Sequence, residues 1–257
     1  MGALRAGAGL VTIATPDPVQ ATLAAAYPEY MTESLESSAD GAIAENNLHS
    51  GNFSRIAEDK TVLAAGPGLG TAPETREFIA GLVHQTALPL ILDADGLNAF
   101  SIRVNTLHDR KTPFLAITPH PGEMARLLGT TTAEIQNDRV RFALESAKRW
   151  NAYVVLKGFH TLIASPHGQL FVNTSGNPGL AKGGSGDVLT GILAALTAQF
   201  GTDDWPRVLG LGVYLHGIAA DLLARDDEDP SGMLASEVAQ EIPAARDWLL
   251  RTLRFGA

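Results

Sequence analysis

The sequence of 257 residues contains no cysteine. Disulfide bonds, thiolate catalysis and zinc sites with cysteine ligands are therefore excluded. Charge is also sparse, because charged residues make up 18% of the chain, below the usual ~25%. The balance is acidic, with 19 Lys and Arg against 28 Asp and Glu and a net charge of −9. Since no basic cluster offsets this charge, we do not expect the chain to bind nucleic acid.

Long apolar segments are missing as well. No apolar run reaches the ~18 residues that a membrane-spanning helix needs, and no signal-peptide pattern opens the chain. We therefore expect a soluble, cytoplasmic protein that does not act at a membrane. Hydrophobic residues make up 45% of the chain, which excludes intrinsic disorder, and the length suits one domain over residues 1–257. Glycine, in contrast, is abundant at 26 residues, about a tenth of the chain against a usual ~7%.

Short β-type runs alternate with longer helical patterns. Several runs are almost wholly apolar, which is typical of a sheet covered on both faces. The predicted strands are residues 10–15, 62–65, 90–92, 114–117, 153–156, 161–164 and 169–173. The last two read as an antiparallel hairpin. The alternation predicts an α/β fold with a mostly parallel central sheet, in which residues 32–59 form an irregular surface excursion between flanks that belong to one sheet.

Recognisable ends mark several of the predicted helices. Asp17 and Pro18 cap a helix over residues 19–26, and Pro121 starts a helix over residues 122–128. A capping box at residues 131–134 opens one helix, on which apolar residues share a face: Val140, Leu144, Ala147 and Trp150. An apolar helix over residues 188–200 follows a glycine-rich segment.

Glycine and polar residues follow the predicted strands at one edge of the sheet, where ligands bind in open parallel sheets. These segments are residues 66–70, 93–98, 118–123, 157–161 and 174–187. The strongest is Lys-Gly-Gly-Ser-Gly-Asp at residues 182–187, because glycines admit an anion and the following helix N-terminus attracts it. Asp187 is a candidate base for a substrate hydroxyl. The alternative is that Asp187 caps the helix and the glycines form a tight turn.

Other polar residues in these segments have both a functional and a structural interpretation. His120 lies between two prolines and near a predicted helix N-terminus. It is either a ligand contact or an exposed turn residue. Glu123 is a first-turn acid or orients a hydrated metal, and Asp93 and Asp95 form turns or hold Mg²⁺ through water. His216 has the spacing of a packed core histidine.

Other known motifs are absent. A Walker A loop, a G-x-S-x-G elbow and an H-E-x-x-H pair do not occur, and residues 66–70 match a dinucleotide fingerprint poorly. Phosphoryl transfer is therefore the chemistry that the sequence supports best.

Four segments together resemble the ADP/ATP-dependent NAD(P)H-hydrate dehydratases, a family with the ribokinase-like α/β/α fold. They are G-P-G-L-G at residues 66–70, D-A-D-G-L-N at 93–98, T-P-H-P-G-E at 118–123 and N-P-G-L-A-K-G-G-S-G-D at 177–187. The third and fourth are highly specific in combination, and the match covers nearly the whole chain.

The resemblance implies repair of hydrated NADH or NADPH, in which the ring hydroxyl is phosphorylated and phosphate then leaves. It implies Asp187 as the base, an anion hole at Gly184, Ser185 and Gly186, and dinucleotide contacts from Gly68, His120 and Asp187. ADP or ATP with Mg²⁺ is the implied phosphoryl donor, contacted by Lys157, Gly158, Phe159, His160, Thr161 and Gly186; no metal ligands are assigned. A homotetramer and an epimerase, as partner or fused domain, are also implied.

One departure from the family pattern concerns the N-terminal end. The family's pattern begins with a further strand and a loop ahead of the segment G-A-L-R-A-G-A-G-L, and we expect the present chain to lack them. Two other functions remain open: a ribokinase-like small-molecule kinase, and a nucleotide-binding protein that the missing segment leaves inactive.

Overall fold

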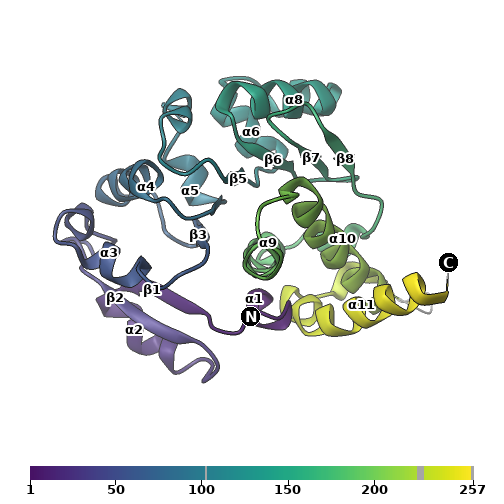
Figure 1. Ribbon diagram of the computed structural model, residues 1–257, viewed down its shortest axis with the longest axis horizontal. Coiled ribbons are helices and arrows are strands. Elements are labelled where there is room, and N and C mark those ends of the chain that lie inside the picture. The colour runs from purple at the N-terminus through teal and green to yellow at the C-terminus, as the bar shows by residue number, and fades with distance from the viewer. Residues whose placement is uncertain (102, 225–228, 256–257) are drawn as a thin grey trace.

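A computed structural model describes residues 1–101, 103–224 and 229–255. The chain forms three layers, with a sheet between two groups of helices (Figure 1). The sheet contains six strands in chain order, and the first four are parallel. They are β3 Leu63–Ala65, β4 Leu90–Leu92, β5 Leu115–Ile117, β6 Tyr153–Leu156, β7 Leu162–Ala164 and β8 Leu170–Val172. The mostly parallel sheet and the antiparallel hairpin β7–β8 are thus confirmed.

Helices cover both faces of this sheet. One face is covered by α4 Pro73–Gln85, α6 Pro121–Leu128 and α8 Arg139–Trp150, and the other by α9 Ser185–Phe200 and α10 Trp205–Leu223. Alternation along the strands makes two cores: Leu90 and Leu92 pack in the first, whereas Ile91 between them packs in the second. No residue of β4, β5 or β6 is more than 7% exposed, which explains why these strands read as continuous apolar runs.

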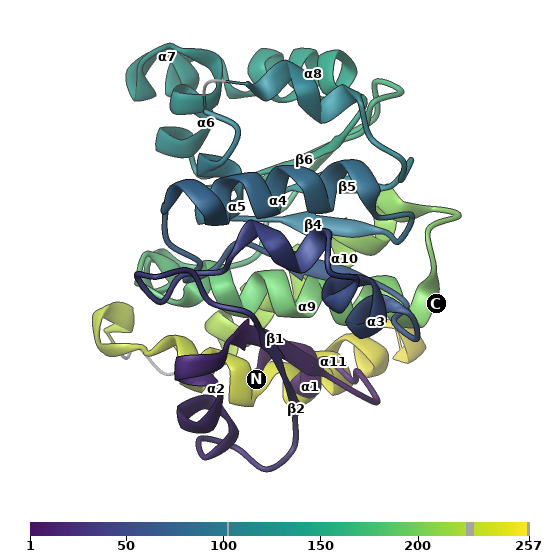
Figure 2. The same cartoon turned by 90° about the vertical axis from the view of Figure 1, so that its left-hand side faces the viewer.

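The remaining elements flank this sandwich. α11 Ala235–Phe255 packs against α10, and α1 Gly2–Arg5 lies beside α9. Figure 2 shows α6, α7 and α8 at one end of the molecule and β1, β2 and α2 at the other. The shorter elements are α2 Asp17–Ala24, α3 Asn52–Ala57, α5 Asp95–Asn98, α7 Thr132–Asn137 and the 3-10 turns Glu45–Leu48, Val104–His108, Pro178–Leu180 and Pro230–Gly232. In the described residues, no helix combines the length and apolar composition needed to cross a membrane.

The prediction for residues 32–59 is wrong. This segment contains β2 Met31–Leu35, which pairs in parallel with β1 Thr12–Pro16 to form a separate two-stranded sheet. Its apolar residues are buried in the main core: Leu35, Ile43, Leu48, Phe53 and Ile56. These apolar residues are spaced irregularly among Ser, Asn and Glu. Their burial could therefore not be predicted from a helical or strand period. The strand predicted at residues 10–15 exists, but it does not belong to the six-stranded sheet.

Two helix predictions also need correction. The helix expected after the capping box ends at Asn137, and α8 starts anew behind Asp138, whose side chain accepts a hydrogen bond from the Arg141 amide. Consequently Val140 points outward, whereas Trp150 is fully buried. α2 starts at Asp17, with Pro16 rather than Asp17 as its N-cap residue. The expected absence of a further N-terminal strand stays a prediction.

Candidate active site

A cleft of about 680 Å³ lies at the carboxyl ends of the parallel strands. The structure brings most of the predicted site residues to it: His120, Lys157, Gly158, Phe159, His160, Thr161, Ser185, Gly186 and Asp187. Gly68 and Gly184 do not line this cleft. The turn that contains Gly68 is fixed nearby, because the Gly70 amide donates to Asp95 at 2.9 Å.

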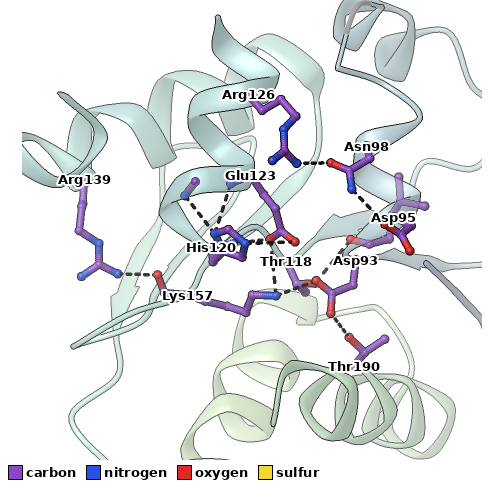
Figure 3. Close-up of polar contacts among 12 residues, drawn as sticks. Asp93, Asp95, Asn98, Thr118, His120, Glu123, Arg126, Arg139, Lys157 and Thr190 are labelled. Atoms are coloured by element: carbon purple, nitrogen blue, oxygen red, sulfur yellow. Dashed lines mark hydrogen bonds and ion pairs between the residues drawn. The ribbon is translucent and has the colours of Figure 1, made fainter. Parts of the chain in front are cut away.

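A buried carboxylate forms the base of the cleft. Asp93 is 1% exposed and follows β4 directly. One carboxylate oxygen accepts a 2.7 Å hydrogen bond from Lys157 Nζ, and the other accepts a 2.7 Å hydrogen bond from the Thr190 hydroxyl on α9 (Figure 3). Asp93 thus joins the loop after β6 to the helix that follows the glycine-rich segment.

The backbone around Asp93 is also constrained. Ala94 has φ 49° and ψ −120°, a conformation that is costly for a residue with a Cβ and that occurs mainly at functional sites. Gly66, with φ 136°, packs so closely that an added Cβ would lie 1.7 Å from the Asp93 carbonyl oxygen. Glycine is therefore required at position 66, and its contact helps to fix the position of Asp93.

The glycine-rich segment starts α9 at Ser185, three residues before the predicted helix, so Asp187 lies in the first helical turn. Gly184 precedes the helix with a φ of 86°. The Ser185 amide donates to the Lys182 carbonyl at 3.3 Å, whereas the amides of Gly186 and Asp187 have no acceptor among the described residues. Open amides at a helix N-terminus attract an anion. The anion hole expected at Gly184, Ser185 and Gly186 stays a prediction, and the bond to Lys182 already occupies the Ser185 amide.

Asp187 has the properties of a base. Its exposed carboxylate lines the cleft and accepts no hydrogen bond from the described residues. Desolvation in the cleft raises the pKa of Asp187, and the negative charge of Asp93 raises it further, while Lys157 acts in the opposite direction. A raised pKa strengthens a carboxylate as a proton acceptor. This geometry agrees with the predicted role but also with a first-turn acid, and activity must separate the two.

His120 is the N-cap residue of α6. Its Nδ1 accepts hydrogen bonds from the amides of Gly122 at 3.0 Å and Glu123 at 3.3 Å, so the ring proton lies on Nε2. Glu123 completes a capping box by accepting from the His120 amide at 2.7 Å. The Glu123 carboxylate is buried and lies 3.8 Å from Lys157 Nζ, so it also faces the cleft (Figure 3).

His216 is buried, as predicted, but it also lines the cleft. Its Nε2 lies 3.4 Å from the hydroxyl of Ser185. Burial, with a smaller effect from Lys157, lowers the pKa of His216 to about 4. The imidazole is therefore neutral near pH 7 and packs beside the N-terminus of α9 without adding charge.

Several residues that support the cleft carried no sequence signal. Thr190 lies within an apolar helical run, and Arg139 lies on α8, outside every glycine-rich segment. Asp221 on α10 accepts hydrogen bonds from the Gly176 amide at 2.8 Å and from Asn177 at 3.2 Å, two residues that line the cleft. A gap of 44 residues separates Asp221 from Asn177, so only the packing of α10 could reveal this contact.

Magnesium was the expected metal. The described residues contain no group of three or more Asp, Glu or His side chains placed to hold a metal ion by themselves. Asp93 and Glu123 nevertheless concentrate negative charge around Lys157. Such a site fits Mg²⁺ that is bound mainly by nucleotide phosphates and water, with one or two protein carboxylates nearby.

The layered, mostly parallel sheet and the glycine-rich start of α9 indicate the class of the protein. A ribokinase-like superfamily protein from Enterococcus faecalis superposes with a TM-score of 0.78, at 27% identity over 96% of this chain and 80% of that one. The fold is thus ribokinase-like, as the resemblance implied. The family model described as NAD(P)H-hydrate dehydratase matches residues 1–244, and the chain belongs to this family.

Individual relatives agree with this assignment. The bifunctional NAD(P)H-hydrate repair enzyme of Moorella thermoacetica is 46% identical over 98% of this chain and 46% of its own length. The ADP-dependent (S)-NAD(P)H-hydrate dehydratase of Neisseria meningitidis is 44% identical over 75% of this chain and 64% of its own. The chain spans about half the length of the bifunctional relatives.

A solved structure carries the same enzyme name. The ADP/ATP-dependent NAD(P)H-hydrate dehydratase of Bacillus subtilis, co-crystallised with ATP and Mg²⁺, has a TM-score of 0.77 at 31% identity. The match covers 96% of this chain and 81% of that one. Family and fold are therefore supported over nearly the whole chain.

Proposed function

We propose that this chain dehydrates hydrated NADH or NADPH, with ADP as phosphoryl donor and ATP as the alternative. The observation that carries the proposal is Asp187 in the first turn of α9, where the amides of Gly186 and Asp187 are open and Lys157 Nζ lies beside Gly186. The Neisseria relative is named for dependence on ADP, and the Bacillus structure for use of either nucleotide.

In the proposed first step, the hydroxyl oxygen of the hydrated ring attacks the terminal phosphorus of the nucleotide. Asp187 takes the hydroxyl proton, and the bond from phosphorus to the leaving oxygen breaks, so ADP becomes AMP. The amides of Gly186 and Asp187 and the Lys157 ammonium face the charge on the transferring group. In the second step, the bond from the ring carbon to the phosphate oxygen breaks and a proton passes from the adjacent carbon to water, which restores the ring double bond.

Different residues of the cleft have different proposed roles in this reaction. Asp93 fixes Lys157 Nζ at 2.7 Å, which keeps the cation at the base of the cleft before nucleotide binds. Glu123, Asp93 and the nucleotide phosphates would surround Mg²⁺, whose contribution is to neutralise phosphate charge. His120 and the turn at Gly68 are the proposed contacts to the hydrated dinucleotide. We also propose that the chain assembles as a homotetramer, as the family resemblance implies. We propose an epimerase as its partner in repair, since several relatives are named bifunctional repair enzymes.

Recovery of NADH from its hydrate tests the reaction. The absorbance of the reduced nicotinamide ring is followed with ADP and with ATP, and AMP and phosphate are quantified. One AMP and one phosphate for each NADH formed from ADP would support the proposal. A stable phosphorylated product would instead indicate a small-molecule kinase, and ADP binding without turnover would indicate a nucleotide-binding protein.

A further inference from the structure

An exposed aromatic side chain stands at the mouth of the cleft. Phe159 lies in the loop between β6 and β7 and is 82% exposed, although a phenylalanine side chain is more favourably buried than left in water. One side of its ring faces His160, with ring centroids 3.9 Å apart and an interplanar angle of 58°. An aromatic side chain left open in this way beside a cleft is available to a flat ligand.

The loop that presents Phe159 is rigidly supported from behind. Arg139 on α8 donates hydrogen bonds to the carbonyls of Leu156 at 2.9 Å and Lys157 at 3.4 Å, and also to the carbonyl of Phe159. The Arg139 guanidinium lies against Gly158, where an added Cβ would be 3.1 Å from Nη2. This guanidinium thus joins three carbonyls of one turn (Figure 3 shows its contact beside Lys157).

The other end of the loop is held as well. His160 has a φ of 53° and its Nδ1 lies 3.2 Å from the Asn173 carbonyl oxygen. The hydroxyl of Thr161 donates to the Gly158 carbonyl at 3.1 Å. Because these contacts order the loop in the absence of a ligand, binding at Phe159 would require little further ordering.

The loop also relates Phe159 to the anion site. Lys157 Nζ lies 3.3 Å from the position that a Cβ on Gly186 would occupy, so the cation of this loop faces the start of α9. Phe159 follows two residues later and farther out, at the exposed mouth. Lys157, Gly186 and Phe159 therefore line one cleft, with the cation beside the start of α9 and the aromatic ring toward solvent.

We propose that Phe159 is the stacking platform for the nucleotide base and that Arg139 is the positioning residue that holds this platform. The proposal rests on the nucleotide dependence proposed above and adds the group that recognises the base. Stacking of a base on an aromatic side chain is worth about 1–3 kcal/mol by alanine substitution. This corresponds to a roughly 5- to 150-fold change in affinity.

Calorimetric titration with ADP and with inorganic pyrophosphate, both with Mg²⁺, separates base binding from phosphate binding. We expect Phe159→Ala to weaken ADP binding about 5- to 150-fold and to leave pyrophosphate binding unchanged. Phe159→Trp is the matched variant that keeps a stacking face, and it should retain ADP affinity. Unchanged ADP affinity in Phe159→Ala, or an equal loss for ADP and pyrophosphate, would overturn the proposal.

Arg139 is tested by Arg139→Met and Arg139→Lys, with circular dichroism to confirm folding. Arg139→Met should weaken the binding of ADP more than the binding of pyrophosphate. Arg139→Lys should restore part of the lost ADP affinity, because lysine still donates hydrogen bonds. Equal ADP affinity in all three proteins overturns the positioning role. Phe159→Ala that changes oligomeric mass but not ADP affinity would make Phe159 a subunit contact instead. These titrations measure binding and need no turnover, so they test Phe159 and Arg139 even if the protein has no dehydratase activity.

Discussion

The floor and the mouth of the cleft are built in opposite ways. We define the floor as Asp93, Lys157, Thr190 and His216, and the mouth as His120, Phe159, His160 and Asp187. Floor side chains are buried or nearly so and engaged with protein partners, as in the contacts that join Asp93 to Lys157 and to α9. Mouth side chains are exposed, although His120 and His160 still contact the backbone.

This difference separates two tasks. The floor holds charge in a fixed place before any ligand arrives, and such preorganisation lowers the cost of stabilising a transition state. The mouth keeps polar and aromatic groups available for ligands. Substitutions in the floor should therefore affect stability strongly, whereas substitutions in the mouth should affect turnover or affinity with little change in stability.

The largest effect is expected at Asp187. Asp187→Asn keeps the shape but removes the base, so we expect kcat to fall about 10²- to 10⁴-fold, with unchanged or slightly raised thermal stability because a desolvated carboxylate is lost. Turnover of hydrated NADH and a thermal melt measure the two quantities. Asp203→Asn, at an exposed aspartate that does not line the cleft, is the control for general loss of negative charge. Turnover by Asp187→Asn at the wild-type rate would contradict the role of base.

The pH profile of the wild-type protein supplies a further check on the same residue. Desolvation raises the pKa of Asp187 above its ordinary value, and the base acts only when deprotonated. Turnover should therefore decline on the acidic side at a higher pH than an ordinary aspartate would give. If turnover declines only at or below the ordinary pKa of an aspartate, the cleft does not raise the pKa of Asp187.

The next largest effect is expected at Asp93. Asp93→Ala leaves Lys157 without its 2.7 Å partner, and removing one member of a buried ion pair costs about 3–5 kcal/mol. The ammonium remains 18% exposed and lies near Glu123, so we expect the lower end of that range. Thr190→Val, which removes the other hydrogen bond to Asp93, is the matched control, with a loss of about 1.5–3 kcal/mol. Urea unfolding measures both, and a larger loss in Thr190→Val would contradict this ranking.

His216 should make stability depend on pH. Its pKa is about 4 in the folded protein and ordinarily 6.5, so the unfolded chain binds more protons between these values. Stability contributed by neutral His216 is therefore present above pH 6.5 and is lost as pH falls toward 4, by at most about 3 kcal/mol. Unfolding of His216→Gln across this range should lack that decline, whereas His160→Gln, at an exposed histidine, should retain it. Identical pH curves for wild type and His216→Gln would contradict the assignment.

The same contrast explains what could be predicted from the sequence. Parallel strands end at one edge of a sheet, so the residues after each strand could be placed together without knowing any contact. Thr190 could not be linked to Asp93, because 97 residues separate them and a threonine in an apolar helix has no distinctive pattern. The buried role of residues 32–59 was hidden for a related reason, since their apolar side chains follow neither helical nor strand spacing. Local patterns thus predicted which loops meet at the cleft, but not the helix side chain that holds Asp93 from α9.

The smallest effects are expected at His120, where two roles can be separated. The imidazole caps α6 through Nδ1, and it also lines the cleft where the hydrated dinucleotide is proposed to bind. Asparagine is a good N-cap residue, so His120→Asn should keep stability and raise only KM for the hydrate. His120→Ala loses the cap and should cost about 1 kcal/mol in addition. An unchanged KM in both variants would contradict the ligand role of His120, which would then be a cap alone, and the mouth would consist of Phe159, His160 and Asp187.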